Sequence, residues 1–203
     1  MIRTWIADVT TLLEEEKYQF YYKKVPIFRK EKADKLRFQA DKALSVGAWT
    51  LWEIMREHYG VNEDAPFNLS HSGHLVMCSL EDTGNVTIKV GCDLEQKKEP
   101  NFKIAKRFFC ENEYRMIVDN ENMFYRFWVL KESFMKATRL GMKLGMDTFE
   151  ISMVDDKPVL KSKPDDIEGI FYLKEYECKG LDYRMAVCST NKDFAENVQK
   201  IYL

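Results

Sequence analysis

The side chains with the clearest chemical potential end the run of residues 86–95, in which apolar and polar residues alternate. Successive side chains of a strand point to opposite faces, so Asp93 and Glu95 project together from the polar face. Gly91 precedes them and leaves room for a close approach. Two neighbouring carboxylates suit a hard, oxygen-liganded cation such as Mg²⁺. An isolated D-x-E is more often a solvated strand end, so the pair needs support from elsewhere in the chain.

A second reactive set lies on a helix that the apolar spacing predicts over residues 123–140. Trp128, Glu132 and Lys136 are four residues apart, so a carboxylate and an ammonium share one face above an aromatic ring. Taken alone, Glu132 and Lys136 are equally compatible with a weak helix-stabilising contact. The opposite face carries the predicted core stripe of Met123, Phe127, Leu130, Phe134 and Ala137.

The segment FNLSHSG, residues 67–73, combines the hydroxyls of Ser70 and Ser72 with the imidazole of His71. In a tight turn ahead of a strand, these groups and the backbone amides could hold phosphate oxygens. A single histidine in a turn more often has a structural role. Without a matching acid or a nucleophile-elbow pattern, a hydrolase triad is not expected here.

These groups need a scaffold of helices and antiparallel strands. Apolar residues from Leu44 to Met55 at helical spacing predict a helix that ends at Gly60. Residues 75–80 and 86–94, separated by a turn at 81–85, predict a hairpin. Further patterns predict a helix at 102–109 and strands at 2–6, 149–154, 170–178 and 183–190. Each half thus combines helices with strands, which predicts an α+β fold of two subdomains that meet near residues 90–95.

The composition of the chain argues against several classes of protein. With 203 residues, 45% of them hydrophobic, the chain can bury a core. It has no apolar stretch long enough to cross a bilayer and no signal-peptide pattern, so we expect a cytoplasmic protein. Five cysteines without CxxC spacing argue against a disulfide framework and a zinc site. A net charge of -2 predicts neither a nucleic-acid nor a membrane partner.

Taken in order, the motifs FNLSHSG, VGCDLE and FWVLKESFMK resemble the three signatures of the Sfp-type 4′-phosphopantetheinyl transferase family. The family patterns are G-[IV]-D-[IV]-E for the second and W-x-x-K-E-[AS]-x-x-K for the third, and Cys92 replaces the aliphatic residue that the family has after the glycine. The similarity continues through residues 104–114 and 182–190 and covers most of the chain. Members commonly carry G-K-P before the first motif, where this chain has GVNEDAP, so adenine contacts are not assigned.

The resemblance implies a fold of two similar subdomains related by pseudo-twofold symmetry, within a monomer. Residues 1–91 would form the side that binds the 3′-phosphate and adenine of coenzyme A. Residues 92–203 would carry the metal and the catalytic groups, with the active site at the interface between the subdomains.

The resemblance also implies roles for individual residues. Asp93, Glu95 and Glu132 would hold Mg²⁺, with Mn²⁺ as the alternative, and the catalytic set would be Asp93, Glu132 and Lys136. Glu132 would take the proton from a serine, while Lys136 would contact phosphates of coenzyme A. Lys131 is less clearly assigned, because it points about 100° away from Glu132 around the helix. Further groups that would bind coenzyme A are His71, Ser70, Ser72, Arg29, Lys32 and Lys35.

The implied activity is transfer of the 4′-phosphopantetheine arm of coenzyme A to a serine of an apo acyl or peptidyl carrier protein, with release of 3′,5′-ADP. An acidic carrier helix could dock on the basic residues that follow the D-x-E motif, Lys97, Lys98, Lys103, Lys106 and Arg107, with Phe108 or Phe109 as apolar contacts. Two alternatives remain open. One is another Mg²⁺-dependent phosphotransferase or phosphodiesterase acting on a nucleotide, and the other is a catalytically silent module that binds coenzyme A.

Overall fold

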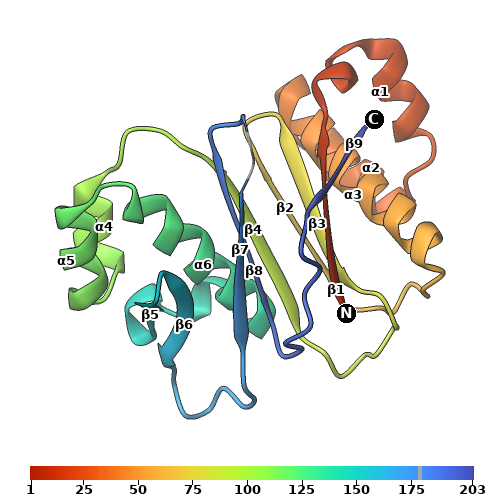
Figure 1. Cartoon of the computed structure of the whole chain (residues 1–203). Helices are drawn as coiled ribbons and strands as arrows, with labels where there is room; N and C mark the ends of the chain where they lie inside the picture. The colour runs from red at the N-terminus through yellow and green to blue at the C-terminus, as the bar shows by residue number, and fades with distance from the viewer. Residues whose placement is uncertain (178–179) are drawn as a thin grey trace.

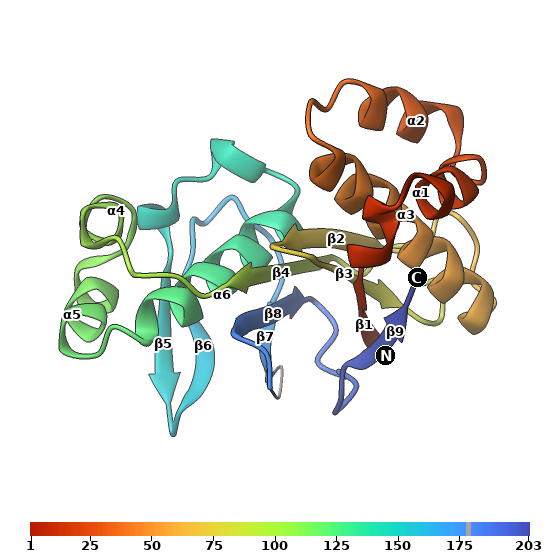
Figure 2. The ribbon, with the colours of Figure 1, turned by 90° about the horizontal axis from the view of Figure 1, so that it is seen from above.

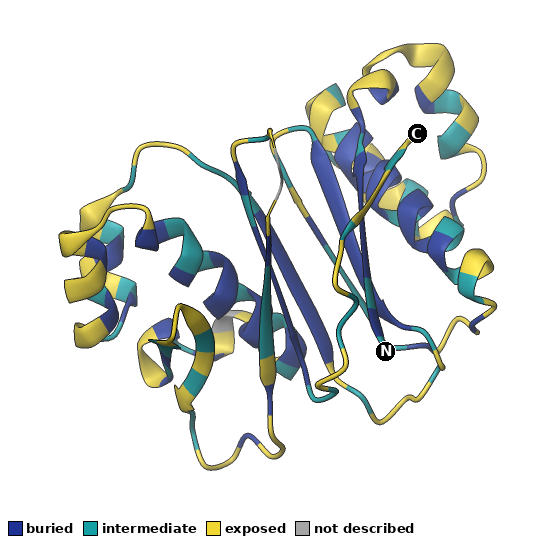
Figure 3. Ribbon diagram, viewed as in Figure 1, coloured by how far each residue is buried: buried dark blue, intermediate teal, exposed yellow. Residues whose placement is uncertain are grey.

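Two β-sheets lie at the centre of the molecule, and a group of helices covers the outer side of each (Figure 1). The computed structural model describes residues 1–177 and 180–203. Buried residues gather in the strands and on the inner faces of the helices, as Figure 3 shows. Among the described residues, no helix combines the length and the apolar character needed to span a membrane.

The first sheet has four strands in the order β2-β3-β1-β9. The first three are antiparallel neighbours, and β9 runs parallel to β1. Residues of β3 are buried on both faces, which explains its uninterrupted apolar sequence. The strand bounds are β1 (Ile2–Asp8), β2 (Phe67–Ser72), β3 (Leu75–Glu81) and β9 (Gln199–Tyr202).

The long helix α3 (Gln39–Tyr59) packs on the outer face of the first sheet. Leu51 and Met55 of its apolar stripe are fully buried there. The helix ends at Gly60, whose φ of 64° lies in the left-handed region, as predicted for a C-terminal glycine. Two short helices that the sequence did not predict precede it, α1 (Glu15–Tyr22) and α2 (Ile27–Asp34).

The second sheet has three antiparallel strands in the order β4-β8-β7. The predicted core stripe of α6 is confirmed, since Phe127, Leu130 and Phe134 are fully buried. The strand bounds are β4 (Val90–Gln96), β7 (Tyr172–Glu177) and β8 (Tyr183–Ser189). The elements packed around this sheet are α4 (Phe102–Phe108), α5 (Glu111–Asp119), α6 (Met123–Thr138) and the hairpin of β5 (Glu150–Val154) and β6 (Lys157–Ser162).

A third buried cluster joins the two sheets. Ile6 and Met77 from the first sheet pack in it with Val90, Cys92 and Leu94 of β4. The alternation predicted for residues 90–95 is therefore confirmed, with the apolar residues of β4 facing this cluster. The cysteines Cys78, Cys92, Cys110 and Cys188 are free thiols, and Cys178 lies outside the described residues.

The predicted hairpin of residues 75–80 and 86–94 is wrong. β3 pairs with β1 and β2, whereas β4 starts only at Val90 and pairs with β8 in the other sheet. The segment before it turns instead, because the side chain of Asn85 accepts hydrogen bonds from the backbone and hydroxyl of Thr87. The real hairpin joins β2 to β3 through Gly73 and His74, so the FNLSHS segment is a strand and not a turn.

The predicted α+β class is confirmed by this arrangement of sheets and helices. The division into residues 1–91 and 92–203 stays a prediction. β4 crosses that boundary, and β9, from the last part of the chain, joins the first sheet beside β1. Figure 2, seen from above, shows β9 next to β1 and far from β5 and β6.

Candidate active site

The helix α6 touches β4 at Gly91. A Cβ atom at this position would lie 2.1 Å from the carbonyl oxygen of Ser133 and 2.3 Å from the backbone nitrogen of Ala137. Both contacts are to backbone, which cannot rotate away, so only glycine allows this approach. The consequence is that Glu132 and Lys136 of α6 lie next to the polar face of β4.

Asp93 is almost completely buried, with 3% of its surface exposed. Its Oδ1 accepts hydrogen bonds from the Ser70 hydroxyl at 2.9 Å and from the Lys136 ammonium at 2.6 Å. The Lys136 ammonium also donates to the Ser70 hydroxyl at 3.1 Å. The second oxygen, Oδ2, is buried and has no hydrogen-bond partner among the described residues.

The carboxyl groups of Glu132 and Glu95 lie near Asp93, and its negative charge influences the pKa of each. Burial and the negative charge of Asp93 raise the pKa of Glu132, although Lys136 opposes this shift. Burial also raises the pKa of Glu95, against a hydrogen bond of 2.7 Å that Ser72 donates to its Oε2. The carboxyl groups therefore repel one another, and a cation between them would be stabilised.

These side chains line one cleft of about 280 Å³ at the junction of β2, β4 and α6. The structure thus brings together most of the predicted site residues. Ser72 does not line the cleft itself, but its hydroxyl reaches Glu95 from the neighbouring position. The lining residues are Leu69, Ser70, His71, Asp93, Glu95, Trp128, Glu132 and Lys136.

The donor set of the cleft matches the chemistry of a divalent ion. Asp93, Glu95 and Glu132 offer only oxygen ligands, which Mg²⁺ and Mn²⁺ prefer, and Asp93 Oδ2 is an unpartnered buried acceptor. As the side chains stand, however, no group of three acidic, histidine or cysteine residues in the described ranges is arranged to hold a metal ion. The Lys136 ammonium lies against Asp93 instead, and it provides the positive charge there.

His71 lies on the other face of β2 from Ser70 and Ser72, and much of it is accessible to solvent. Partial desolvation by its neighbours, together with the positive charges of Lys136 and Lys32, lowers its pKa. The imidazole is therefore neutral at physiological pH, with one N–H free to donate.

The predicted basic residues Arg29, Lys32 and Lys35 lie on and just after α2. Arg29 is half-buried, with its guanidinium 4.6 Å from the centroid of the Trp49 ring, and burial lowers its pKa. Its Nε has no hydrogen-bond partner among the described residues. Lys32 is exposed but close enough to influence His71, whereas Lys35 is exposed without a contact to the described part of the cleft.

Lys131 turns away from the cleft into the core. Its ammonium is fully buried and lies 2.7 Å from Glu113 Oε1 and 2.7 Å from the carbonyl oxygen of Phe149. Glu113 also accepts hydrogen bonds from the backbone of Cys110 and Ile151. This network connects α5 and β5 to α6 at Lys131, the residue that precedes Glu132.

Leu69 is a cleft residue that the sequence interpretation missed. The prediction of a turn at residues 67–73 does not take account of the alternation of apolar and polar residues in this segment. In a strand, Leu69 and His71 share one face, while Ser70 and Ser72 share the other. The alternation of apolar and polar residues was the available signal.

A second, more apolar groove of about 380 Å³ adjoins the cleft. Trp128 and Glu132 line both spaces, so the groove and the cleft meet at these two side chains. The other residues that line it are Arg107, Phe108, Met135, Leu144, Gly145, Met146 and Asp147. Phe109 is instead buried in the core.

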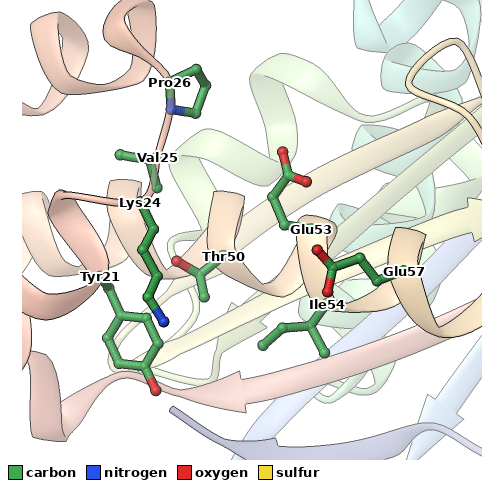
Figure 4. Close-up of a pocket in the computed structure, with 8 residues that line it drawn as sticks. All are labelled: Tyr21, Lys24, Val25, Pro26, Thr50, Glu53, Ile54 and Glu57. Atoms are coloured by element: carbon green, nitrogen blue, oxygen red, sulfur yellow. The ribbon is translucent and has the colours of Figure 1, made fainter.

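A separate cavity of about 420 Å³ lies between α3 and the segment that joins α1 to α2 (Figure 4). It shares no lining residue with the cleft. Glu53, one of its acids, already accepts hydrogen bonds from Trp49 and Arg56, so its charge is satisfied. The chemistry predicted from the sequence is therefore concentrated at the junction of β2, β4 and α6.

The family model and two relatives that this sequence matches are described as 4'-phosphopantetheinyl transferases. The family model described as "4'-phosphopantetheinyl transferase superfamily" matches residues 89–188. The chain is 35% identical to the 4'-phosphopantetheinyl transferase Sfp of Bacillus subtilis over 68% of its length, and 33% identical to the 4'-phosphopantetheinyl transferase psf-1 of Bacillus pumilus over 66%. These matches span 61% and 56% of the two relatives.

A structural match is the holo-[acyl-carrier-protein] synthase of Thermotoga maritima. It has a TM-score of 0.43 and 22% sequence identity, and the match covers 50% of this chain and 61% of that one.

Proposed function

Because the chain belongs to the 4′-phosphopantetheinyl transferase superfamily, we propose that it moves the 4′-phosphopantetheine arm of coenzyme A onto a serine of an apo acyl or peptidyl carrier protein. The observation that carries this proposal is the cleft in which carboxyl groups of β4 and α6 meet Lys136 and His71. In the reaction, the serine oxygen bonds to the β-phosphorus of coenzyme A, the bond to 3′,5′-ADP breaks, and the serine loses its proton.

We assign the uptake of that proton to Glu132. Its raised pKa makes the ionised carboxylate a stronger base than an exposed glutamate. Unlike Asp93 and Glu95, it accepts no hydrogen bond from another described side chain, so its oxygens are not committed within the described part of the protein. The groove beside it gives the serine a path to the carboxylate.

The cations around the cleft fit the phosphates of coenzyme A. Burial lowers the pKa of Lys136, but the charge and hydrogen bond of Asp93, together with the other neighbouring groups such as Glu132, raise it overall, so the side chain stays an ammonium. The neutral His71 can donate one hydrogen bond to the 3′-phosphate, and Ser70 of the same strand also lines the cleft. Further positive charge would come from Arg29, Lys32 and Lys35, of which Arg29 is half-buried and has an Nε without a hydrogen-bond partner among the described residues.

Asp93, Glu95 and Glu132 would hold Mg²⁺ or Mn²⁺. When bound, the ion would offset the negative charge of the pyrophosphate of coenzyme A. The protein's own contribution is to bring these carboxyl groups to one side of the cleft, with Lys136 on the same helix face as Glu132.

The groove beside Glu132 is the proposed docking site of the carrier protein. Phe108, Met135 and Leu144 give it apolar walls, and α4 presents Lys103, Lys106 and Arg107 close by. An acidic, amphipathic helix would meet both the apolar surface and the positive charge there. The proposal includes a monomeric, cytoplasmic enzyme.

The test is incubation with coenzyme A, Mg²⁺ and an apo carrier protein, followed by intact-mass measurement of the carrier. We expect the mass of the carrier to rise by that of the phosphopantetheine arm. Asp93→Ala and Glu132→Ala should each abolish the rise while circular dichroism shows an intact fold. Glu57→Ala, an exposed glutamate on α3, is the matched control and should transfer normally.

Two results would overturn the proposal. If neither acyl nor peptidyl carriers gain mass, the transfer assignment is wrong. If 3′,5′-ADP is released from coenzyme A in the absence of any carrier, the protein is a phosphodiesterase.

A further inference from the structure

The strands β2 and β4 lie side by side although they belong to different sheets (Figures 1 and 2). β2 is the edge of the first sheet and β4 is the edge of the second. Among the described residues, β2 pairs through its backbone with β3, and β4 with β8. The outward backbone amides of β4 therefore need acceptors from some other source, because a buried N–H without a partner is costly.

Side chains of β2 supply these acceptors. Alternate residues on one face of β2 meet alternate amides of β4, in three hydrogen bonds that repeat at two-residue intervals along both strands. We call this row of contacts the seam. Its bonds are Cys92 N to Asn68 Oδ1 at 2.9 Å, Leu94 N to Ser70 Oγ at 3.3 Å and Gln96 N to Ser72 Oγ at 3.1 Å.

The seam has one register. In each bond the two residues are 24 positions apart along the chain, so β2 and β4 run in the same direction and advance together. A shift by one residue would place Leu69 and His71 opposite the amides of β4, and a leucine has no acceptor to offer. The side-chain spacing of FNLSHS thus specifies how the two sheets meet.

Each of the two serines of the seam also donates a hydrogen bond to a carboxyl group of β4. Ser70 donates to Asp93 and Ser72 donates to Glu95, at 2.9 Å and 2.7 Å. A hydroxyl has one proton to donate and can accept as well. The hydroxyl oxygen of each serine therefore accepts a hydrogen bond from a backbone amide of β4. The same hydroxyl donates to the neighbouring carboxyl group and so orients it.

We propose that Asn68, Ser70 and Ser72 form a side-chain substitute for a pairing strand, and that Ser72 is a positioning residue that fixes the carboxyl group of Glu95. The effect on transfer rests on the proposed function, whereas the seam and its effect on Glu95 do not. The hydroxyl of Ser72 is thereby committed within the protein, and its role in binding coenzyme A is indirect.

The direct test measures amide hydrogen exchange by NMR in metal-free protein. In Ser72→Ala, the exchange of the Gln96 amide should accelerate by about 10-fold or more, because its acceptor is gone, while amides in β1 keep their rates. Ser72→Thr retains the hydroxyl and should restore protection. Ser189→Ala is the matched control, since it also removes a hydroxyl that accepts a backbone amide, that of Asn191, at the opposite end of the β4–β8 pair from Gln96.

The second measurement is Mn²⁺ affinity, followed by electron paramagnetic resonance of the free ion. Ser72→Ala should weaken binding by about 3- to 10-fold, because Glu95 loses its fixed orientation, and Ser72→Thr should recover it. In the transfer assay, kcat should fall while KM for coenzyme A stays within about 2-fold.

The proposal is overturned if the Gln96 amide and the Mn²⁺ affinity are both unchanged in Ser72→Ala, or if Ser189→Ala changes them equally. If the unmodified protein transfers nothing to a carrier but Ser72→Ala still changes exchange and Mn²⁺ affinity, the proposed function fails and the seam stands.

Discussion

The ammonium nitrogen of Lys136 lies 2.6 Å from Oδ1 of Asp93, and this ion pair connects α6 to β4. The carboxyl group is nearly inaccessible to solvent, so the lysine supplies its main counter-charge. A divalent cation and the ammonium would compete for the same carboxyl group, because each is stabilised by its negative charge.

Replacing this lysine should separate metal binding from transfer. In Lys136→Met, we expect Mn²⁺ to bind at least as tightly as in the unmodified protein, because the competing ammonium is gone. Transfer should fall by about 100-fold or more, as happens when a preorganised charge at a reacting phosphate is lost. Lys143→Met, an exposed lysine after α6, serves as the control. Weaker Mn²⁺ binding in Lys136→Met would contradict the competition.

The close approach at Gly91 predicts a different kind of loss. Gly91→Ala should lower the free energy of unfolding by about 1–3 kcal/mol, since its Cβ meets backbone atoms of α6. Displacement of α6 moves Glu132 and Lys136, so transfer per folded molecule should also decrease. In Gly47→Ala, the new Cβ meets the side chain of Val9, away from the cleft, and transfer should be retained. Urea unfolding and the mass assay distinguish the two effects, and equal transfer in both variants would rule out this role for Gly91.

Removing one partner of the buried pair of Glu113 and Lys131 should strongly destabilise the fold. Glu113→Ala leaves a fully buried ammonium without its counter-charge, which costs about 3–5 kcal/mol in comparable cases. Glu111 on the same helix forms an exposed pair with Arg115, and Glu111→Ala should cost about 0–1 kcal/mol. Urea titrations measure both. A loss below about 1 kcal/mol in Glu113→Ala would show that the pair is not needed.

The lowered pKa of His71 predicts how stability depends on pH. The unfolded chain binds a proton near the ordinary histidine pKa of about 6.5, but the folded protein binds it only at lower pH. Between these two values the unfolded state holds more protons, so stability falls as the solution is acidified through this window. Burial is the main cause of the lowered pKa, the positive charges of Lys136 and Lys32 add to it, and the negative charges of Asp41 and Asp93 oppose it.

His71→Gln removes this titration. Unfolding free energies at pH 7.5 and pH 5, measured without metal, should show that the unmodified protein loses more stability on acidification than the variant. An identical loss in both proteins would mean that the pKa of His71 is the same in the folded and unfolded states.

Much of the site could be predicted because its residues follow simple periods. The stripe of Phe127, Leu130 and Phe134 correctly predicted the buried side of α6. Glu132 and Lys136 were therefore expected on its other side. The alternation through Asp93 and Glu95 likewise predicted which side chains of β4 point away from the core.

The pairing of the strands could not be predicted in the same way. β3 is buried on both faces, so its sequence does not indicate which neighbour it takes, and the turn-forming residues after Glu81 resemble a hairpin. The partner of Lys131 was also hidden, because Glu113 lies on the separate helix α5 and only the packing of α5 against α6 brings them together. Such long-range contacts leave no local pattern in a single sequence.

The seam between β2 and β4 has a consequence for how this protein can change over evolutionary time. A backbone ladder forms with almost any side chains, so drift in sequence seldom abolishes it. Here the junction is encoded by Asn68, Ser70 and Ser72, and a single codon change that puts a residue without a hydrogen-bond acceptor at one of these positions deletes one of its bonds. Natural selection can therefore loosen or retune the fit between the two sheets one residue at a time, without rebuilding either of them.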